Sequence, residues 1–186
     1  MDIRATAIPE VKVIIPARYG DHRGFFSEVY SRRALAEAGI DIEFVQDNHS
    51  YSATRGTLRG LHFQRPTATQ TKLVRVLRGS IVDVAVDCRV GSPTYGDHVI
   101  VELAAGDGRQ LLCPKGFAHG TLTLEADTEI TYKVDAYYAP ELDFGLRWDD
   151  PTVGIDWPLA AEDIVLSERD RNLPSFEDLP KVFSYL

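Results

Sequence analysis

The chain lacks the features that mark membrane, secreted and nucleic-acid-binding proteins. Its apolar runs are all shorter than the roughly 20 residues of a membrane-spanning helix, and its first residues, Met1-Asp2-Ile3-Arg4, begin no apolar leader. Two cysteines in 186 residues are too few for a disulfide framework. The formal net charge of -8 argues against a basic face that tracks phosphates. We therefore expect a cytoplasmic protein with no membrane and no nucleic-acid partner.

Repeats, low-complexity tracts and linker-like stretches are also missing, so we expect residues 1–186 to form a single domain. Turn residues separate many short β-prone runs, which is typical of an antiparallel sandwich or barrel. The predicted strands are 11–15, 25–30, 44–50, 72–77, 80–87, 98–103, 110–113, 120–124 and 129–134. The fold class is therefore mainly β.

Three further local patterns refine this prediction. Ser31 is a good N-cap and Gly39 a good C-terminal stop for a short helix over 32–38. Arg78-Gly79, between two predicted strands, indicates a tight hairpin turn. Apolar and mostly polar residues alternate over 80–87, so we expect one apolar face there. From Trp148 onward the chain is turn-rich, and we expect it to wrap the sheet edges.

The most informative segment is Arg59-Gly60-Leu61-His62-Phe63-Gln64, followed by Gln70-Thr71-Lys72-Leu73-Val74. It sets a candidate base, His62, beside the cations Arg59 and Lys72. With Arg23 and Arg75 on the same sheet system, these cations would form a positive pocket in an acidic protein. Such a set suits removal of a proton next to a carbonyl on an anionic substrate. The alternatives are a buried structural histidine and ordinary solvated surface charges.

Several motifs, in order along most of the chain, resemble one family. They are Asp21-His22-Arg23-Gly24-Phe25-Phe26-Ser27-Glu28, Gln46-Asp47-Asn48-His49-Ser50, the two runs around His62 and Lys72, Gly91-Ser92-Pro93-Thr94-Tyr95-Gly96, Pro114-Lys115-Gly116-Phe117-Ala118-His119-Gly120, Tyr132-Lys133, Asp150-Pro151, Ile155-Asp156-Trp157-Pro158 and Ser167-Glu168-Arg169-Asp170. Together they resemble the dTDP-4-dehydrorhamnose 3,5-epimerases. Arg169, where the family usually has lysine, and Asp149, where it often has asparagine, depart from the pattern.

The resemblance implies a cupin-type jelly-roll β-barrel or sandwich with a short helix near the N-terminus and C-terminal wrapping segments. It implies an isomerase that inverts C3 and C5 of dTDP-4-dehydro-6-deoxy-D-glucose, in dTDP-L-rhamnose biosynthesis. No cofactor is expected. The expected partners are the dTDP-linked 4-keto-6-deoxyhexose and a second copy, in a homodimer with exchanged N-terminal strands.

The resemblance also implies roles for individual residues. His62 would be the general base, Asp170 its orienting carboxylate, Lys72 the group that stabilises the enolate, and Tyr132 the acid on the opposite face. An imidazolium, with a pKa of about 6.5, is far more acidic than a carbon next to a ketone, so enolate stabilisation is essential. The implied substrate-binding residues are Arg23, Phe26, Glu28, Gln46, Asp47, Asn48, Arg59, His119, Tyr138, Asp143 and Arg169. The ring that stacks on thymine could instead be the adjacent Tyr137.

Three rival functions remain open at this point. A monofunctional 3- or 5-epimerase would use the same His–Lys–Tyr–Asp set. A metal-dependent cupin enzyme would need more ligands than His62 and His119, because no second histidine or glutamate follows His62 closely. We therefore expect no metal. A non-catalytic sugar-binding module would leave the proton-transfer groups unexplained.

Overall fold

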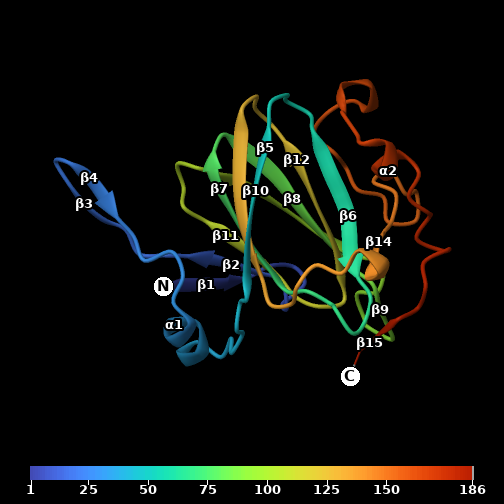
Figure 1. The fold of residues 1–186 in the computed structure, drawn as a ribbon, viewed down its shortest axis with the longest axis horizontal. Coiled ribbons are helices and arrows are strands. Elements are labelled where there is room, and N and C mark those ends of the chain that lie inside the picture. The colour runs from blue at the N-terminus through green and yellow to red at the C-terminus, as the bar shows by residue number, and fades with distance from the viewer. Residues whose placement is uncertain (186) are drawn as a thin grey trace.

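The computed structural model describes residues 1–185 and is built mainly from two facing β-sheets (Figure 1). The predicted sandwich is confirmed, and the two sheets do not close into a barrel. Apolar side chains from both sheets, including Val74 and Val76 from one and Ile81, Ala85 and Leu103 from the other, form the core between them. This burial of apolar surface is the main driving force for stacking the sheets.

The first sheet has six strands in the spatial order β1-β2-β11-β7-β13-β5. All of its pairings are antiparallel. Its strands are β1 (Asp2–Ala5), β2 (Lys12–Ile15), β5 (Gln46–Ser52), β7 (Lys72–Arg78), β11 (Gln110–Cys113) and β13 (Thr128–Val134).

The second sheet has five strands in the order β10-β8-β12-β6-β14, and it is also antiparallel. Its strands are β6 (Leu58–Gln64), β8 (Ser80–Asp87), β10 (His98–Ala104), β12 (Phe117–Thr123) and β14 (Asp143–Gly145). The smaller elements are β3 (Tyr19–Asp21), β4 (Gly24–Phe26), β9 (Arg89–Val90), β15 (Phe183–Ser184), the helices α1 (Arg32–Glu37) and α2 (Glu168–Arg171), and the 3-10 turns η1 (Pro140–Leu142) and η2 (Ala161–Asp163).

The predicted helix is confirmed as α1. The Ser31 hydroxyl accepts a hydrogen bond from the Ala34 amide at 3.3 Å, and Gly39 follows the helix with φ of 82°. Leu35 packs with Ile14, Leu73 and Leu112, so α1 covers the outer face of the six-stranded sheet.

The expected apolar face of β8 is confirmed by Val82, Val84 and Val86, and the opposite face of the strand is buried as well. Val82, Val84 and Val86 pack against C-terminal residues such as Leu146 and Phe176. The C-terminal part of the chain therefore covers the outer face of the five-stranded sheet, in addition to extending its edge as β14 (Figure 1).

Two local predictions are wrong. The segment Arg78-Gly79 is no hairpin, because β7 and β8 belong to different sheets and do not pair. Gly79 instead lets the chain cross between the sheets with φ of 75°, where a Cβ would lie 2.4 Å from the Thr128 hydroxyl. The predicted strand 25–30 ends at Phe26, because β4 pairs only with β3 in an arm that projects from the sheets (Figure 1).

Within residues 1–185, no helix combines the length and the apolar character needed to cross a membrane.

Candidate active site

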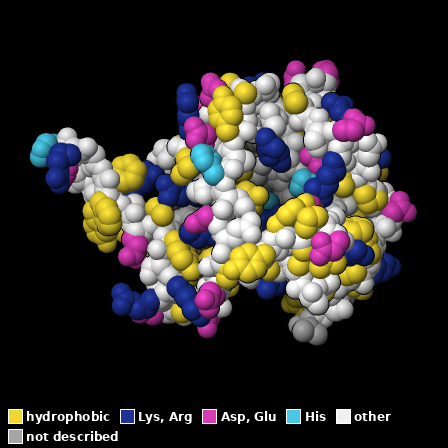
Figure 2. Space-filling model, viewed as in Figure 1, with side chains coloured by type: hydrophobic (Ala, Val, Ile, Leu, Met, Phe, Trp, Pro, Cys, Tyr) yellow, Lys and Arg dark blue, Asp and Glu magenta, His cyan; other side chains and the backbone are white. Residues whose placement is uncertain are grey.

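A cavity of about 570 Å³ lies between the two sheets, and a second of about 370 Å³ adjoins it. Four residues line both cavities: His62, Lys72, Tyr132 and Arg169. Figure 2 shows the hollow on this face of the molecule, with Lys or Arg and His side chains exposed in it. Three of the candidate catalytic residues, His62, Lys72 and Tyr132, therefore lie where the two cavities meet, and Asp170 lines the first.

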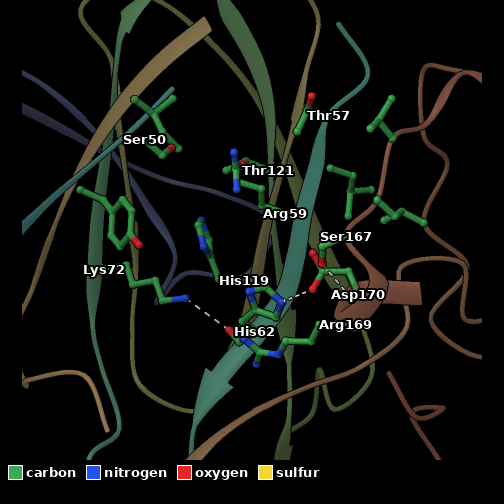
Figure 3. Close-up of a pocket in the computed structure, with 15 residues that line it drawn as sticks. Ser50, Thr57, Arg59, His62, Lys72, His119, Thr121, Ser167, Arg169 and Asp170 are labelled. Carbon is green, nitrogen blue, oxygen red and sulfur yellow. Dashed lines mark hydrogen bonds and ion pairs between the residues drawn. The ribbon is translucent and has the colours of Figure 1, made fainter. Parts of the chain in front are cut away.

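His62 projects from β6 and is held by a carboxylate from the C-terminal part of the chain. Its Nε2 lies 2.6 Å from Asp170 Oδ1, and Asp170 is buried in α2 (Figure 3). The Ser167 hydroxyl caps α2 by accepting a hydrogen bond from the Asp170 amide at 3.1 Å. Burial alone would raise the pKa of Asp170. Its hydrogen bond and charge interaction with His62 outweigh this effect and lower the pKa. An ionised Asp170 orients the imidazole and leaves Nδ1 to act on a substrate.

An irregularity in β6 brings Arg59 and His62 to the same cavity. In regular strands residues three apart face opposite sides. Between its pairings with His119 and Thr121 of β12, β6 contains one extra residue, as in a β-bulge. Gly60 takes φ of 146° there, and a Cβ at this position would lie 2.5 Å from the Gly120 Cα. The bulge needs glycine because β12 passes so close.

Lys72 lies on β7, on the sheet opposite His62, and its ammonium donates a hydrogen bond to the His62 carbonyl oxygen at 3.3 Å (Figure 3). Burial lowers the pKa of Lys72. A protonated ammonium in this enclosed position can stabilise negative charge that develops on a substrate oxygen.

Tyr132 lies on β13, in the same sheet as Lys72, so the phenol and the His62 imidazole come from opposite walls of the cavity. Burial raises the pKa of Tyr132, and the nearby Arg59 partly opposes this effect. A phenol that stays protonated can donate a proton to a carbanion. The arrangement can thus remove a proton from one face of a planar centre and add one to the other.

His119 forms a second histidine–carboxylate pair in the cavity. Its Nε2 lies 2.6 Å from Asp83 Oδ1, and both side chains are buried. Burial lowers the pKa of His119, and Asp83 opposes this effect.

The second cavity is more polar. The Tyr138 hydroxyl donates to Asp143 at 3.0 Å, and Arg169 forms an ion pair with the same carboxylate at 2.8 Å. Gln46 and Asn48, on β5, are hydrogen-bonded to each other at 2.8 Å and also line it. Tyr138 lines this cavity, whereas Tyr137 lines neither, which favours Tyr138 as the stacking ring.

The structure does not bring every predicted residue to the cavities. Those that line neither are Arg23, Phe26, Glu28, Asp47 and Arg75. Asp47 alternates with Gln46 and Asn48 along β5, faces outward and pairs with Lys133 at 2.7 Å. The expected positive pocket is therefore wrong in part: in one chain, Arg59 and Lys72 line it while Arg23 and Arg75 do not. Arg23 and Phe26 lie in the projecting arm, and their contact with a neighbouring copy stays a prediction.

Some lining residues had no role in the sequence interpretation. Gln64, Gln70, Ser50 and Thr121 line the cavities, and Asp83 lies directly behind His119. The signal for Asp83 was a charged residue in the middle of an apolar strand, because such a residue needs a buried partner. Within residues 1–185, no cluster of three or more His, Cys, Asp or Glu side chains is arranged to hold a metal ion.

Comparisons with known proteins agree with this geometry. A family model described as dTDP-4-dehydrorhamnose 3,5-epimerase matches residues 5–178. A dTDP-4-dehydrorhamnose 3,5-epimerase of Sinorhizobium fredii is 52% identical over 100% of this chain and 95% of its own. The crystal structure of dTDP-6-deoxy-D-glucose-3,5-epimerase from Legionella pneumophila, in complex with dTDP-4-keto-L-rhamnose, superposes with a TM-score of 0.94 at 45% identity, covering 100% of this chain and 98% of that one. A double mutant of a 3′-monoepimerase from Streptomyces bikiniensis, in complex with dTDP, has a TM-score of 0.88 at 32% identity, covering 97% and 92%.

Proposed function

The chain belongs to the dTDP-4-dehydrorhamnose 3,5-epimerase family, and from this premise we propose that it inverts both C3 and C5 of dTDP-4-dehydro-6-deoxy-D-glucose. It is an isomerase, and its product is dTDP-4-dehydro-L-rhamnose, in the biosynthesis of dTDP-L-rhamnose. The observation that carries the proposal is that His62 and Tyr132 project from opposite sheets into one cavity. Inversion needs a base and an acid on opposite faces of the reacting carbon.

The reaction begins when His62 removes a proton from a carbon next to the C4 ketone. The electron pair moves into the carbonyl, and the resulting enolate oxygen is stabilised by the Lys72 ammonium. Asp170 stabilises the imidazolium that forms. Tyr132 then donates a proton to the opposite face of the same carbon, which restores the ketone with inverted configuration.

The second cavity provides a site for the nucleotide part of the substrate. Arg169, which lines both cavities, and Arg59, which lines the adjoining first cavity, supply guanidinium groups suited to bidentate phosphate contacts. Tyr138 supplies an exposed ring for stacking on the base. Gln46 and Asn48 supply amide donors and acceptors for the nucleoside.

A second copy completes the nucleotide site in this proposal. The arm carries Tyr19, Phe25 and Phe26, all of which are 63% exposed or more. An exposed aromatic surface of this kind indicates a protein interface. We place Arg23, Phe26 and Glu28 in the nucleotide site of the neighbouring subunit, as in a homodimer with exchanged N-terminal strands.

Residues 1–186 act as one catalytic domain in this proposal, since C-terminal residues share a core cluster with β6 and β8. Cys88 and Cys113 are buried free thiols, which fits the reducing cytoplasm.

Incubation with substrate in D2O tests the proposed reaction. Each inversion replaces a carbon-bound hydrogen by one from solvent, so NMR of the product should show deuterium at both C3 and C5. The second candidate function is that of a monoepimerase, because the chain is also similar to the Streptomyces bikiniensis 3′-monoepimerase. Deuterium at one carbon alone would favour this function. Deuterium at neither carbon would contradict the proposed function.

A further inference from the structure

One arginine joins the projecting arm to the body of the sandwich. Arg18 directly precedes β3, and its guanidinium donates hydrogen bonds to the carbonyl oxygens of Gly106 at 2.6 Å and Ala105 at 3.4 Å. These two residues follow β10, in the turn that leads to β11. The same guanidinium lies over the ring of Phe25 on β4, with 4.4 Å between its Cζ atom and the ring centroid. Arg18 therefore contacts both the arm and the body.

The arm has few other contacts that could hold it in one direction. Strands β3 and β4 pair only with each other, and an isolated two-stranded hairpin is marginally stable in water. The Ser27 hydroxyl donates to the Ala17 carbonyl oxygen at 2.8 Å, which closes the base of the arm but does not join it to the body. Among residues 1–185, Arg18 donates every hydrogen bond that joins residues 16–28 to the rest of the chain.

The turn between β10 and β11 leaves room for this guanidinium. Gly108 has φ of 71°, and a Cβ at this position would lie 2.6 Å from Arg18 Nη2. A larger residue would therefore displace Arg18 from the turn. The carboxylate of Asp107 is already engaged, because it accepts hydrogen bonds from the Arg109 amide and side chain, each at 2.7 Å. Arg18 binds the turn through carbonyl oxygens instead.

We propose that Arg18 is a positioning residue that holds the arm in the direction from which it reaches the nucleotide site of a second copy. The inference rests on the proposed function, because it concerns how the arm completes that site. Arg18 touches no substrate atom in this scheme. It acts through Phe25 and the rest of β4, which carries Phe26.

The physical reason is the entropy of the arm. An arm that can point in many directions loses that freedom when it docks, and the lost conformational entropy weakens binding. Holding the arm in one direction in the free subunit removes part of this cost before docking. A guanidinium suits this task, because its planar fork can bind two carbonyl oxygens and stack on a ring at the same time.

Arg18 lies apart from the proposed proton-transfer groups. It lines neither cavity, and the arm that follows it projects away from the two sheets (Figure 1). Loss of Arg18 should therefore weaken the binding of substrate and leave the chemical step in place. Such a change raises KM with little effect on kcat.

The test measures dTDP affinity by calorimetry, KM and kcat of epimerisation, and hydrogen–deuterium exchange of the arm amides without nucleotide. Arg18→Ala should weaken dTDP binding and raise KM by about 10-fold, the effect of one hydrogen bond and one exposed cation–π contact. The value of kcat at saturating substrate should stay within about twofold of wild type. The arm amides should exchange faster than in the wild type, and those of β7 should exchange at the wild-type rate.

A matched control is Arg109→Ala, which removes another arginine of the same turn, paired with Asp107 at 2.7 Å. It should keep wild-type dTDP affinity and wild-type exchange of the arm amides. Arg18→Lys keeps the positive charge and can keep one carbonyl contact, so it should recover part of the lost affinity.

A second variant tests the same contact with Arg18 retained. Gly108→Ala places a Cβ against the guanidinium and should weaken dTDP binding as Arg18→Ala does. In the Arg18→Ala background the same change should weaken dTDP binding no further, because the contact is already lost. This variant also serves if Arg18→Ala does not fold.

Wild-type dTDP affinity in Arg18→Ala would overturn this role of Arg18, whether or not the arm amides exchange faster. Weaker dTDP binding with wild-type exchange of the arm amides would overturn it as well, since Arg18 would then contact the nucleotide directly. In both cases deuterium at C3 and C5 of the wild-type product would leave the proposed epimerisation intact. Absence of label from both carbons in the wild type would instead overturn the proposed function.

Discussion

At the scale of single residues, burial shifts the pKa values of Lys72 and Tyr132 in the cavity in opposite directions. Lys72 must be charged to stabilise an enolate, but its pKa is lowered by burial. Tyr132 must be protonated to act as an acid, and its pKa is raised by burial. These opposite shifts move the pKa of Lys72 down and that of Tyr132 up, which favours Lys72 as the group that limits activity at high pH.

We predict that the alkaline loss of kcat belongs to Lys72. Activity should be present below the lowered pKa of Lys72 and fall as the pH rises through it, while Tyr132 is still protonated. Lys72→Met should lower kcat by roughly 100- to 1,000-fold, as for loss of one oxyanion donor. Its residual activity should lack this alkaline limb in a pH–rate profile. An unchanged alkaline limb in Lys72→Met would assign the limb to another group.

Residue identities were the part of the site that could be predicted best. His62, Lys72, Tyr132 and Asp170 stand in quoted motifs, and the structure brings all four to one cavity. Asp83 was not assigned, since its partner His119 lies 36 residues away and no local pattern joins them. Arg59 and His62 face the same cavity, although residues three apart on a regular strand face opposite sides. The bulge in β6 explains this exception.

At the scale of elements, the short helix α2 sets the position of the Asp170 carboxylate beside His62. A four-residue helix has little stability of its own, so its cap is important for holding Asp170 against His62.

Ser167→Ala is predicted to impair catalysis through this helix. Loss of the cap should lower the free energy of unfolding by about 1 kcal/mol. It should also lower kcat by about tenfold, since small misplacements of catalytic groups are costly, while dTDP affinity stays unchanged. Ser31→Ala removes the equivalent cap of α1, which packs on the outer face of the other sheet. It should cost similar stability in a chemical denaturation curve and leave kcat unchanged, so equal kcat in the two variants would refute this role of α2.

Strand positions were predicted well where the apolar pattern was strong, and strand partners were not predicted. The ranges 80–87 and 110–113 coincide with β8 and β11. The turn at Arg78-Gly79 was misread because a glycine with positive φ suits both a hairpin and a crossing between sheets. Which of the two forms depends on pairing with distant strands, β13 for β7 and β12 for β8.

At the scale of the whole molecule, the sandwich places His62, the proposed base, and Tyr132, the proposed acid, on separate sheets, and the arm extends beyond both sheets (Figure 1). The exposed aromatic side chains of the arm support the proposal that another copy covers it.

We predict that light scattering will show a dimer. Phe26 is the second candidate ring for stacking on thymine, beside Tyr138, so Phe26→Ala should weaken dTDP binding by about 1–3 kcal/mol, the usual value of a base–aromatic stack, and leave the folded subunit intact. Ile100→Ala, at an exposed position on β10, is the control and should bind dTDP normally. Unaltered dTDP affinity in a dimeric Phe26→Ala would remove the arm from the nucleotide site.

The most direct test of the two-wall arrangement is solvent exchange in Tyr132→Phe. With the acid removed and the base retained, deuterium should still enter the recovered, uninverted substrate while formation of inverted product falls by about 100-fold or more. Equal loss of substrate labelling and of product would show that Tyr132 does not act separately from the base, and it would contradict the proposed inversion.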